Sequence, residues 1–285
     1  TENLAVMGFL IFYMPKNADL LSNSGFTRML DTVDCFSFRG HEEAFARLGV
    51  AVAGRHLGVL TGEVGSGKSA LIRRLFRSLD PMMTLPVYLS QSNLKPRDFY
   101  SELLRQVGEV PPYSLPKAKR LWEEVLQQRE AQGERSLLVV VDEAHEMSED
   151  MLLELRFAMG AQMDARSYFP IILSGQPELR KRLRLKKFEA IAQRIGMQYH
   201  LTGMTREETG AYIKHHMRTA GLERPVFSES AVQMIHAASQ GLPRVINLIC
   251  THALYDAEGK GHEVVEEAHI GRVLADLDKQ RGAAG

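Results

Sequence analysis

Eight consecutive residues have the types and spacing that bind phosphate groups. Residues 62–69 read Gly-Glu-Val-Gly-Ser-Gly-Lys-Ser and match the phosphate-loop (Walker A) pattern at every defined position. Glycines let the backbone curl so that successive amides point inward, and a helix that begins there adds the positive end of its dipole. We therefore predict that Lys68 reaches the β- and γ-phosphates of a nucleoside triphosphate and that Ser69 is a ligand of Mg²⁺. The residues assigned to the nucleotide from this loop are Gly62, Glu63, Val64, Gly65, Ser66, Gly67, Lys68, Ser69 and Ala70.

Two carboxylates, Asp142 and Glu143, directly follow the apolar run at residues 137–141. A carboxylate at the carboxyl end of a central strand, beside a phosphate loop, can hold the water shell of Mg²⁺. The glutamate after it can orient the attacking water and take its proton. We therefore predict that Asp142 holds the metal, that Glu143 is the catalytic base, and that the reaction is hydrolysis of a nucleoside triphosphate.

Four further residues are expected to sense or stabilise the γ-phosphate. Ser174 and Gln176 lie where the fourth predicted strand ends, and either can serve as the sensor. Arg194 precedes the last strand, from where an arginine can reach the site of a neighbouring subunit and neutralise transition-state charge. Arg244 stands in a Gly-Leu-Pro-Arg sequence at the start of a later helix. With Lys68 and Glu143, these four complete the predicted catalytic set.

The elements that position these residues alternate between short apolar runs and longer helical patterns. Strands are predicted at 56–61, 85–90, 137–141, 169–174 and 197–201. Such alternation is typical of an α/β fold, here a phosphate-loop NTPase with a five-stranded parallel sheet between helices. The run at 137–141 is apolar at every position, so we place that strand in the middle of the sheet.

The pattern becomes helical only after residue 203, which predicts a small all-α lid domain. Thr205 and Glu208 have the spacing of a capping box, and Pro243 suits the first position of another helix. Helices are expected from about residue 205, from 230 to 240, from 243 to 259 and from 266 to 279. The predicted domains are an N-terminal extension at 1–35, a nucleotide-binding domain at 36–202 and a lid at 203–285.

Composition narrows the class of protein. The 285 residues carry 35 Lys and Arg against 35 Asp and Glu, and 45% are hydrophobic, which excludes a disordered chain and a generally basic DNA-coating protein. Any contact with DNA must therefore come from a local patch. The nine-residue apolar run at 6–14 is too short to span a membrane, and two distant cysteines favour a reducing compartment, so we expect a cytoplasmic protein without a membrane partner. The histidines match no metal-binding pattern, and we expect His262 and His269 to be solvated.

Taken together, the motifs resemble an AAA+ ATPase of the ExeA/GspA branch, which is close to the transposition regulators of the TnsC, TniB and MuB type. The resemblance covers about residues 36–275. It is carried by Leu-Thr-Gly-Glu-Val-Gly-Ser-Gly-Lys at 60–68, Val-Asp-Glu-Ala at 141–144, Gly-Gln-Pro-Glu-Leu-Arg at 175–180, Ala-Gln-Arg-Ile at 192–195 and Gly-Leu-Pro-Arg-Val-Ile-Asn at 241–247.

The resemblance implies further site residues and two functions. It places Phe38 and Arg39 at the adenine, and Pro243 and Arg244 at the nucleotide. It implies slow, assembly-dependent ATP hydrolysis with Mg²⁺ by a ring or helical filament that wraps double-stranded DNA and recruits or activates a transposase, with a target-selector protein as another possible partner. The alternative is a cytoplasmic ATPase of a secretion-assembly system with no DNA role.

Two basic clusters are candidates for the DNA contact, which phosphate binding would make sensitive to salt. We favour the first for DNA because it lies in the insertion that faces the pore of related assemblies, and the second, at residues 180–187, for contacts between protomers. The first cluster consists of Lys95, Arg97, Lys117, Lys119 and Arg120.

Overall fold

The computed structural model describes residues 26, 36–161 and 166–282. It divides into two compact units, which are described separately below. One unit is Arg39–Thr202, and the other contains the residues from Gly203 onward together with those up to Phe38. Except for Phe26, the predicted extension at 1–35 lies outside the described residues.

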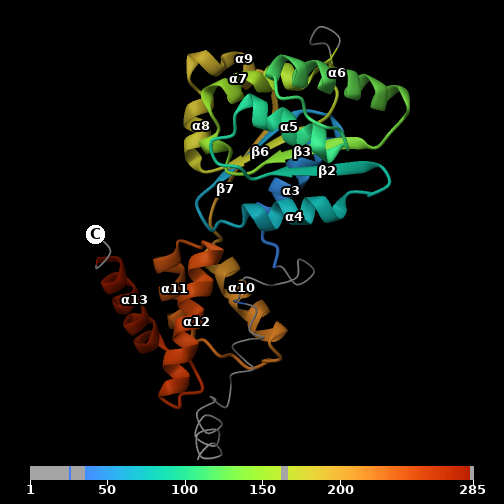
Figure 1. Cartoon of the computed structure of the whole chain (residues 1–285). Helices are drawn as coiled ribbons and strands as arrows, with labels where there is room; N and C mark the ends of the chain where they lie inside the picture. Colours follow the sequence, from blue (N-terminus) through green and yellow to red (C-terminus); the bar gives the residue numbers. More distant parts are fainter. Residues whose placement is uncertain (1–25, 27–35, 162–165, 283–285) are drawn as a thin grey trace, which may run out of the picture. The chain divides into compact units, whose positions relative to one another are not determined.

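The first unit is built on a five-stranded, entirely parallel sheet, which confirms the predicted fold class (Figure 1). All five observed strands start and end within two residues of the predictions. The spatial order is β2-β3-β6-β1-β7. The strands are β1 (Leu57–Gly62), β2 (Thr84–Leu89), β3 (Ser136–Val141), β6 (Ile171–Gly175) and β7 (Ile195–Leu201).

The central position of the sheet belongs to β6, so the placement of residues 137–141 in the middle is wrong. Strand β3 is an interior strand with a neighbour on each side. The strands β1 and β6 are buried along their whole length, as β3 is over all but its first residue. Apolar content therefore identifies all three as interior strands but does not show which of them is central.

Helices cover both faces of this sheet (Figure 1). Alternate strand residues such as Val59, Val139 and Leu173 join one large core with the helices that follow β2, β3 and β6. The opposite face meets α3 and α4. The helices of this unit are α3 (Arg39–Ala53), α4 (Lys68–Ser78), α5 (Pro96–Gln106), α6 (Leu115–Ala131), α7 (Glu149–Ala158), α8 (Pro177–Leu183) and α9 (Glu189–Ala192).

A two-stranded antiparallel hairpin, β4 (Gly160–Ala161) and β5 (Arg166–Ser167), follows α7 and was not predicted. Two paired residues on each side are too few to produce a readable alternation of apolar and polar residues. The hairpin therefore adds an element between α7 and β6 that the sequence pattern does not reveal.

The second unit is helical, with α10 (Arg206–Thr219), α11 (Glu229–Ser239), α12 (Pro243–Gly259) and α13 (Glu267–Gly282). The predicted capping box is present, because the Thr205 hydroxyl accepts from the Glu208 backbone amide and the Glu208 carboxylate accepts from the Thr205 amide. Before α12, Gly241 has a φ of 72°, and an added Cβ would lie 2.0 Å from the Met204 backbone oxygen. This close backbone approach requires glycine there.

One expectation for this unit is wrong. His269 is buried, and its Nε2 lies 2.8 Å from Nδ1 of His262, so the two rings are a hydrogen-bonded pair instead of two solvated side chains. Within the described residues, none of the helices combines the length and the apolar character that crossing a membrane requires.

Candidate active site

The phosphate loop joins β1 to α4 and adopts the conformation that its glycines permit. Gly65 and Gly67 have φ angles of 82° and 99°, in the left-handed region. Gly67 is also the N-cap of α4, and a Cβ there would lie 2.6 Å from Nε2 of His41. Glycine at position 67 is thus required by backbone conformation and by the packing of α3 behind the loop.

Lys68 is buried inside the loop that it follows. Its Nζ donates to the backbone oxygens of Gly62 at 2.8 Å and Glu63 at 3.1 Å. Burial lowers the pKa of Lys68, and the negative charges of Glu143, Asp142 and Glu63 oppose that shift. The loop therefore holds an ammonium group close to both predicted catalytic carboxylates.

Other residues of the loop fit a polyphosphate and its metal. The Ser66 hydroxyl is buried and has no hydrogen-bond partner within the part of the chain described here. An orphaned buried hydroxyl inside a cradle of amides calls for a polar ligand. Ser69, in the first turn of α4, is exposed, as a metal ligand at the mouth of the loop must be. The residues present thus fit a nucleoside triphosphate with Mg²⁺.

Asp142 is buried at the end of β3 and is held by three donors. The Ser174 hydroxyl donates to its Oδ1 at 2.7 Å, the Glu143 amide donates to the same oxygen at 3.0 Å, and the Tyr88 hydroxyl donates to Oδ2. The Ser174 hydroxyl thus orients the aspartate, and its role as a sensor of the γ-phosphate stays a prediction. Tyr88 was missed because it comes from the neighbouring strand β2, and only the sheet register brings it there.

Glu143 adopts a backbone conformation that is unusual for a residue with a side chain. Its φ is 49° and its ψ is 35°, a left-handed conformation that costs about 1 kcal/mol or more for a non-glycine residue. Its carboxylate is about half exposed, and Oε2 lies 3.3 Å from Nδ1 of His145. The strained turn thus presents a solvent-accessible carboxylate beside the buried Asp142. The backbone amide of Gln176 also faces Nδ1 of His145, at 3.5 Å.

Arg194 lies between α9 and β7 and is half-buried. Its Nη1 donates to the backbone oxygen of Arg156, in α7, at 2.8 Å. The guanidinium is therefore anchored within its own chain. A role at a neighbouring subunit's site would need its remaining donors or a change of this contact, so that role stays a prediction.

The residues assigned to the adenine and to the lid fall in different units. Arg39 is the exposed first residue of α3, in the Arg39–Thr202 unit. Phe38 is buried, Arg244 is exposed in the first turn of α12, and both belong to the helical unit together with Pro243. Their contacts with nucleotide remain predictions.

The first basic cluster is smaller than the sequence suggests. Lys119 pairs with the buried carboxylate of Glu154 at 2.6 Å, so it is not an accessible cation. Its four other members, Lys95, Arg97, Lys117 and Arg120, are exposed.

The second basic cluster is also partly used within the fold. Arg182 donates to the backbone oxygens of His145 and Met147, and Lys187 pairs with Glu149 at 2.5 Å. Both side chains therefore tie α8 and the segment after it to the region that follows Glu143.

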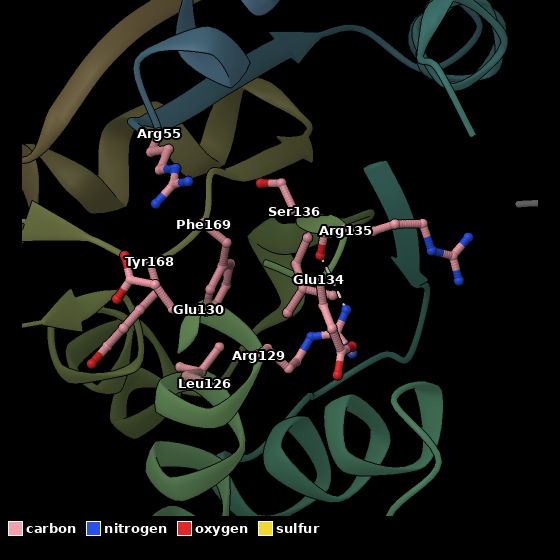
Figure 2. Close-up of a pocket in the computed structure, with 10 residues that line it drawn as sticks. Arg55, Leu126, Arg129, Glu130, Glu134, Arg135, Ser136, Tyr168 and Phe169 are labelled. Atoms are coloured by element: carbon pink, nitrogen blue, oxygen red, sulfur yellow. Dashed lines mark hydrogen bonds and ion pairs between the residues drawn. The ribbon is translucent and has the colours of Figure 1, made fainter. Parts of the chain in front are cut away.

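A small cavity of about 70 Å³ lies at the opposite, amino-terminal edge of the sheet, where Ser136 begins β3 and Phe169 precedes β6 (Figure 2). Two of its arginines, Arg129 and Arg135, make contacts within the fold. Arg129 pairs with Glu134 at 2.6 Å and donates to the backbone oxygen of Arg135 at 3.1 Å. This cavity is separate from the phosphate loop and contains none of the predicted catalytic residues.

Comparisons with known proteins show which family and which solved structures the chain is similar to. Residues 52–183 match the family described as "AAA domain". The fold is similar to the Cdc6p structure from Pyrobaculum aerophilum, with a TM-score of 0.65, 16% identity and coverage of 85% of this chain and 68% of that one. It is also similar to the RuvB branch-migration motor of Thermotoga maritima, with a TM-score of 0.53, 17% identity and coverage of 87% and 74%. The comparisons thus show the predicted fold and, through the AAA domain match, support the predicted ATPase activity.

A curated relative indicates which branch of these ATPases the chain is similar to. The chain is 34% identical over 231 residues to the general secretion pathway protein A of Aeromonas hydrophila, which covers 79% of this chain. It spans 42% of that relative, which is less than half of its length. The match supports the predicted ExeA/GspA branch. The relationship to the transposition regulators remains a prediction.

Proposed function

We propose that this chain is the ATPase of a secretion-assembly system, in which ATP binding favours self-assembly and partner engagement and hydrolysis reverses them. This proposal joins the alternative function of the sequence analysis, an ATPase of a secretion-assembly system with no DNA role, to the assembly cycle that the resemblance implies for the transposition regulators. The observation that carries it is the 34% identity to general secretion pathway protein A. The matched length of 231 residues exceeds the Arg39–Thr202 unit, so the similarity extends into the helical unit as well.

In this proposal the loop and Lys68 bind the triphosphate. Backbone amides and the start of α4 favour negative charge, and Lys68 would exchange carbonyl contacts for phosphate oxygens. Bound Mg²⁺ would neutralise developing charge and orient the phosphates. Ser69 and Asp142 would hold that ion, and the three donors on Asp142 would fix its carboxylate in one orientation.

Glu143 would activate water from the exposed side of the site. Its carboxylate is solvent-accessible and its backbone is fixed by the turn after β3, so it can orient a water molecule and accept its proton. Arg194 of a neighbouring copy would supply positive charge in the transition state, which would make turnover depend on assembly.

The test compares Glu143→Gln with the control variant Glu146→Gln, which replaces an exposed glutamate three residues away. Glu143→Gln should bind Mg·ATP but lose about 10²- to 10⁴-fold in turnover, the usual contribution of a general base. Lys68→Ala should lose nucleotide binding. Turnover of Glu143→Gln equal to that of the wild type would refute the assigned base.

A second candidate is the ATP-dependent DNA-binding regulator of transposition. It is favoured by the exposed cations Lys95, Arg97, Lys117 and Arg120. It requires ATP-dependent retention of duplex DNA that weakens steeply between low and moderate salt. Intact ATPase activity with no such retention selects the secretion-assembly function.

A further inference from the structure

A surface groove of about 480 Å³ lies in the Arg39–Thr202 unit, away from the phosphate loop. Lys95 and Arg97, at the start of α5, form one wall, and Leu115 lies at the start of α6. Leu153 and Phe157, from α7, form the other wall. The volume is in the range that accommodates ligand or peptide side chains.

The α7 wall carries two exposed apolar side chains. Leu153 and Phe157 are four residues apart, so they lie on one face of the helix, and they are 42% and 59% exposed. The other face of α7 is buried in the core through Met151, Leu155 and Ala158. The helix therefore presents a second apolar face to the groove, and a contiguous exposed apolar surface of this kind marks an interaction site.

The opposite wall is cationic and partly fixed in place. Nε of Arg97 donates to the backbone oxygen of Tyr113 at 3.0 Å, and the guanidinium lies over the Tyr113 ring at 4.4 Å. Within the part of the chain that the structure describes, the two terminal nitrogens of Arg97 have no hydrogen-bond partner, and Lys95 has no acidic one. An ordered guanidinium with two terminal nitrogens available suits a carboxylate.

The acids of the groove do not cancel this charge. Glu154 also lines the groove, but Lys119 neutralises it at 2.6 Å and the Tyr100 hydroxyl donates to it at 2.8 Å. Among the described residues, Asp150 is then one unneutralised carboxylate in the groove against the two cations Lys95 and Arg97. The groove therefore has a positive wall facing an apolar one.

We propose that this groove binds an acidic, apolar segment of a partner protein, with large apolar side chains on Leu153 and Phe157 and a carboxylate on Arg97. The positive charge of Lys95 and Arg97 favours an acidic ligand. The exposed apolar side chains of α7 favour a protein over DNA, because a phosphate backbone placed there would lose hydration without gaining apolar contact. The proposal goes beyond the proposed function and does not depend on the outcome of the ATPase test.

The probe is a random peptide library of about 16 residues displayed on phage, selected on the full chain and counter-selected on Phe157→Ser. Enriched peptides should combine Asp or Glu with Leu, Phe or Trp. A synthetic copy, followed by fluorescence anisotropy, should bind at least about tenfold more weakly to Phe157→Ser and to Arg97→Ala. Leu153→Ser provides a second variant if Phe157→Ser folds poorly.

Met82→Ser is the matched control, because Met82 is 79% exposed and does not line the groove. It should bind the peptide as the wild type does, and ATP turnover of Phe157→Ser should be unchanged, which separates this test from that of the proposed function. Failure to enrich acidic, apolar peptides, or binding that is indifferent to Phe157→Ser, overturns the proposal. So does binding of duplex DNA that Arg97→Ala removes and Phe157→Ser leaves intact.

Discussion

A buried histidine should make the helical unit sensitive to acid. His216, in α10, is 1% exposed and packs against the rings of Phe26, Tyr212 and His215, with centroid distances of 5.1, 4.2 and 5.5 Å. Neither ring nitrogen has a hydrogen-bond partner among the described residues. Burial, with a smaller contribution from the charge of His215, lowers the pKa of His216 to about 4.

The sign and size of the effect follow from linkage. The unfolded chain, with a histidine pKa of about 6.5, binds the proton more readily than the folded chain, so protonation favours unfolding. The stabilising difference is fully present above about pH 6.5 and is lost as the pH falls towards 4. For a folded pKa of about 4, the free energy of unfolding should fall by about 2 kcal/mol between pH 8 and pH 5.

The assay is urea unfolding at several pH values, with two probes. Far-UV circular dichroism reports the helices of both units, whereas fluorescence of Trp122, the single tryptophan, reports the Arg39–Thr202 unit alone, so a loss seen only in the dichroism belongs to the helical unit. The acid-dependent loss of stability should appear in the dichroism. It should disappear in His216→Leu but persist in the control variant His252→Leu, which replaces an exposed histidine. A pH dependence unchanged in His216→Leu, or a His216 ring that titrates near pH 6.5 by NMR, would refute the reasoning.

Three further predictions concern the active site. Gly67→Ala places a Cβ 2.6 Å from His41 Nε2 at a φ of 99°, so ATP affinity measured with a fluorescent analogue should fall at least about tenfold, and unchanged affinity would contradict the required glycine. Tyr88→Phe removes one donor from Asp142, so half-maximal turnover should need up to about tenfold more Mg²⁺ while metal-free ATP binding is unchanged; a matched loss of both would assign Tyr88 to folding alone. Arg194→Ala should keep nucleotide binding but lose about 10²-fold or more of the concentration-dependent turnover, and normal hydrolysis would exclude its role between subunits.

The sheet was predictable because its signal is local. The interior strands β1, β3 and β6 are short, mainly apolar runs that are buried over nearly their whole length, and β3 is apolar at five consecutive positions. The spatial order of the strands was not predictable, because burial is nearly the same in β1, β3 and β6 and only backbone pairing distinguishes these strands. Local pattern thus predicts elements, while their neighbours depend on pairing across long sequence separations.

The candidate site likewise contains residues that local spacing predicts and residues that only the fold brings together. Lys68 follows the loop that it serves, and Asp142 and Glu143 are adjacent, so spacing alone predicts them. The residues that orient Asp142 come from other strands, Tyr88 from 54 positions earlier and Ser174 from 32 positions later. Because one sequence contains no register, the contacts that Tyr88 and Ser174 make with Asp142 could not be predicted.

Charge runs are the least predictable feature, and they decide which partner is plausible. A cluster of cations in the sequence suggests nucleic acid, but long-range contacts determine how much of it is accessible: Glu154 neutralises Lys119 across 35 positions. Two of the remaining cations, Lys95 and Arg97, line the same groove as Leu153 and Phe157, which α7 exposes. A duplex backbone can use only the charges, whereas an acidic peptide can use both walls. Because an interface gains most from desolvated apolar anchors and uses charge mainly for orientation and selectivity, the mixed surface favours protein.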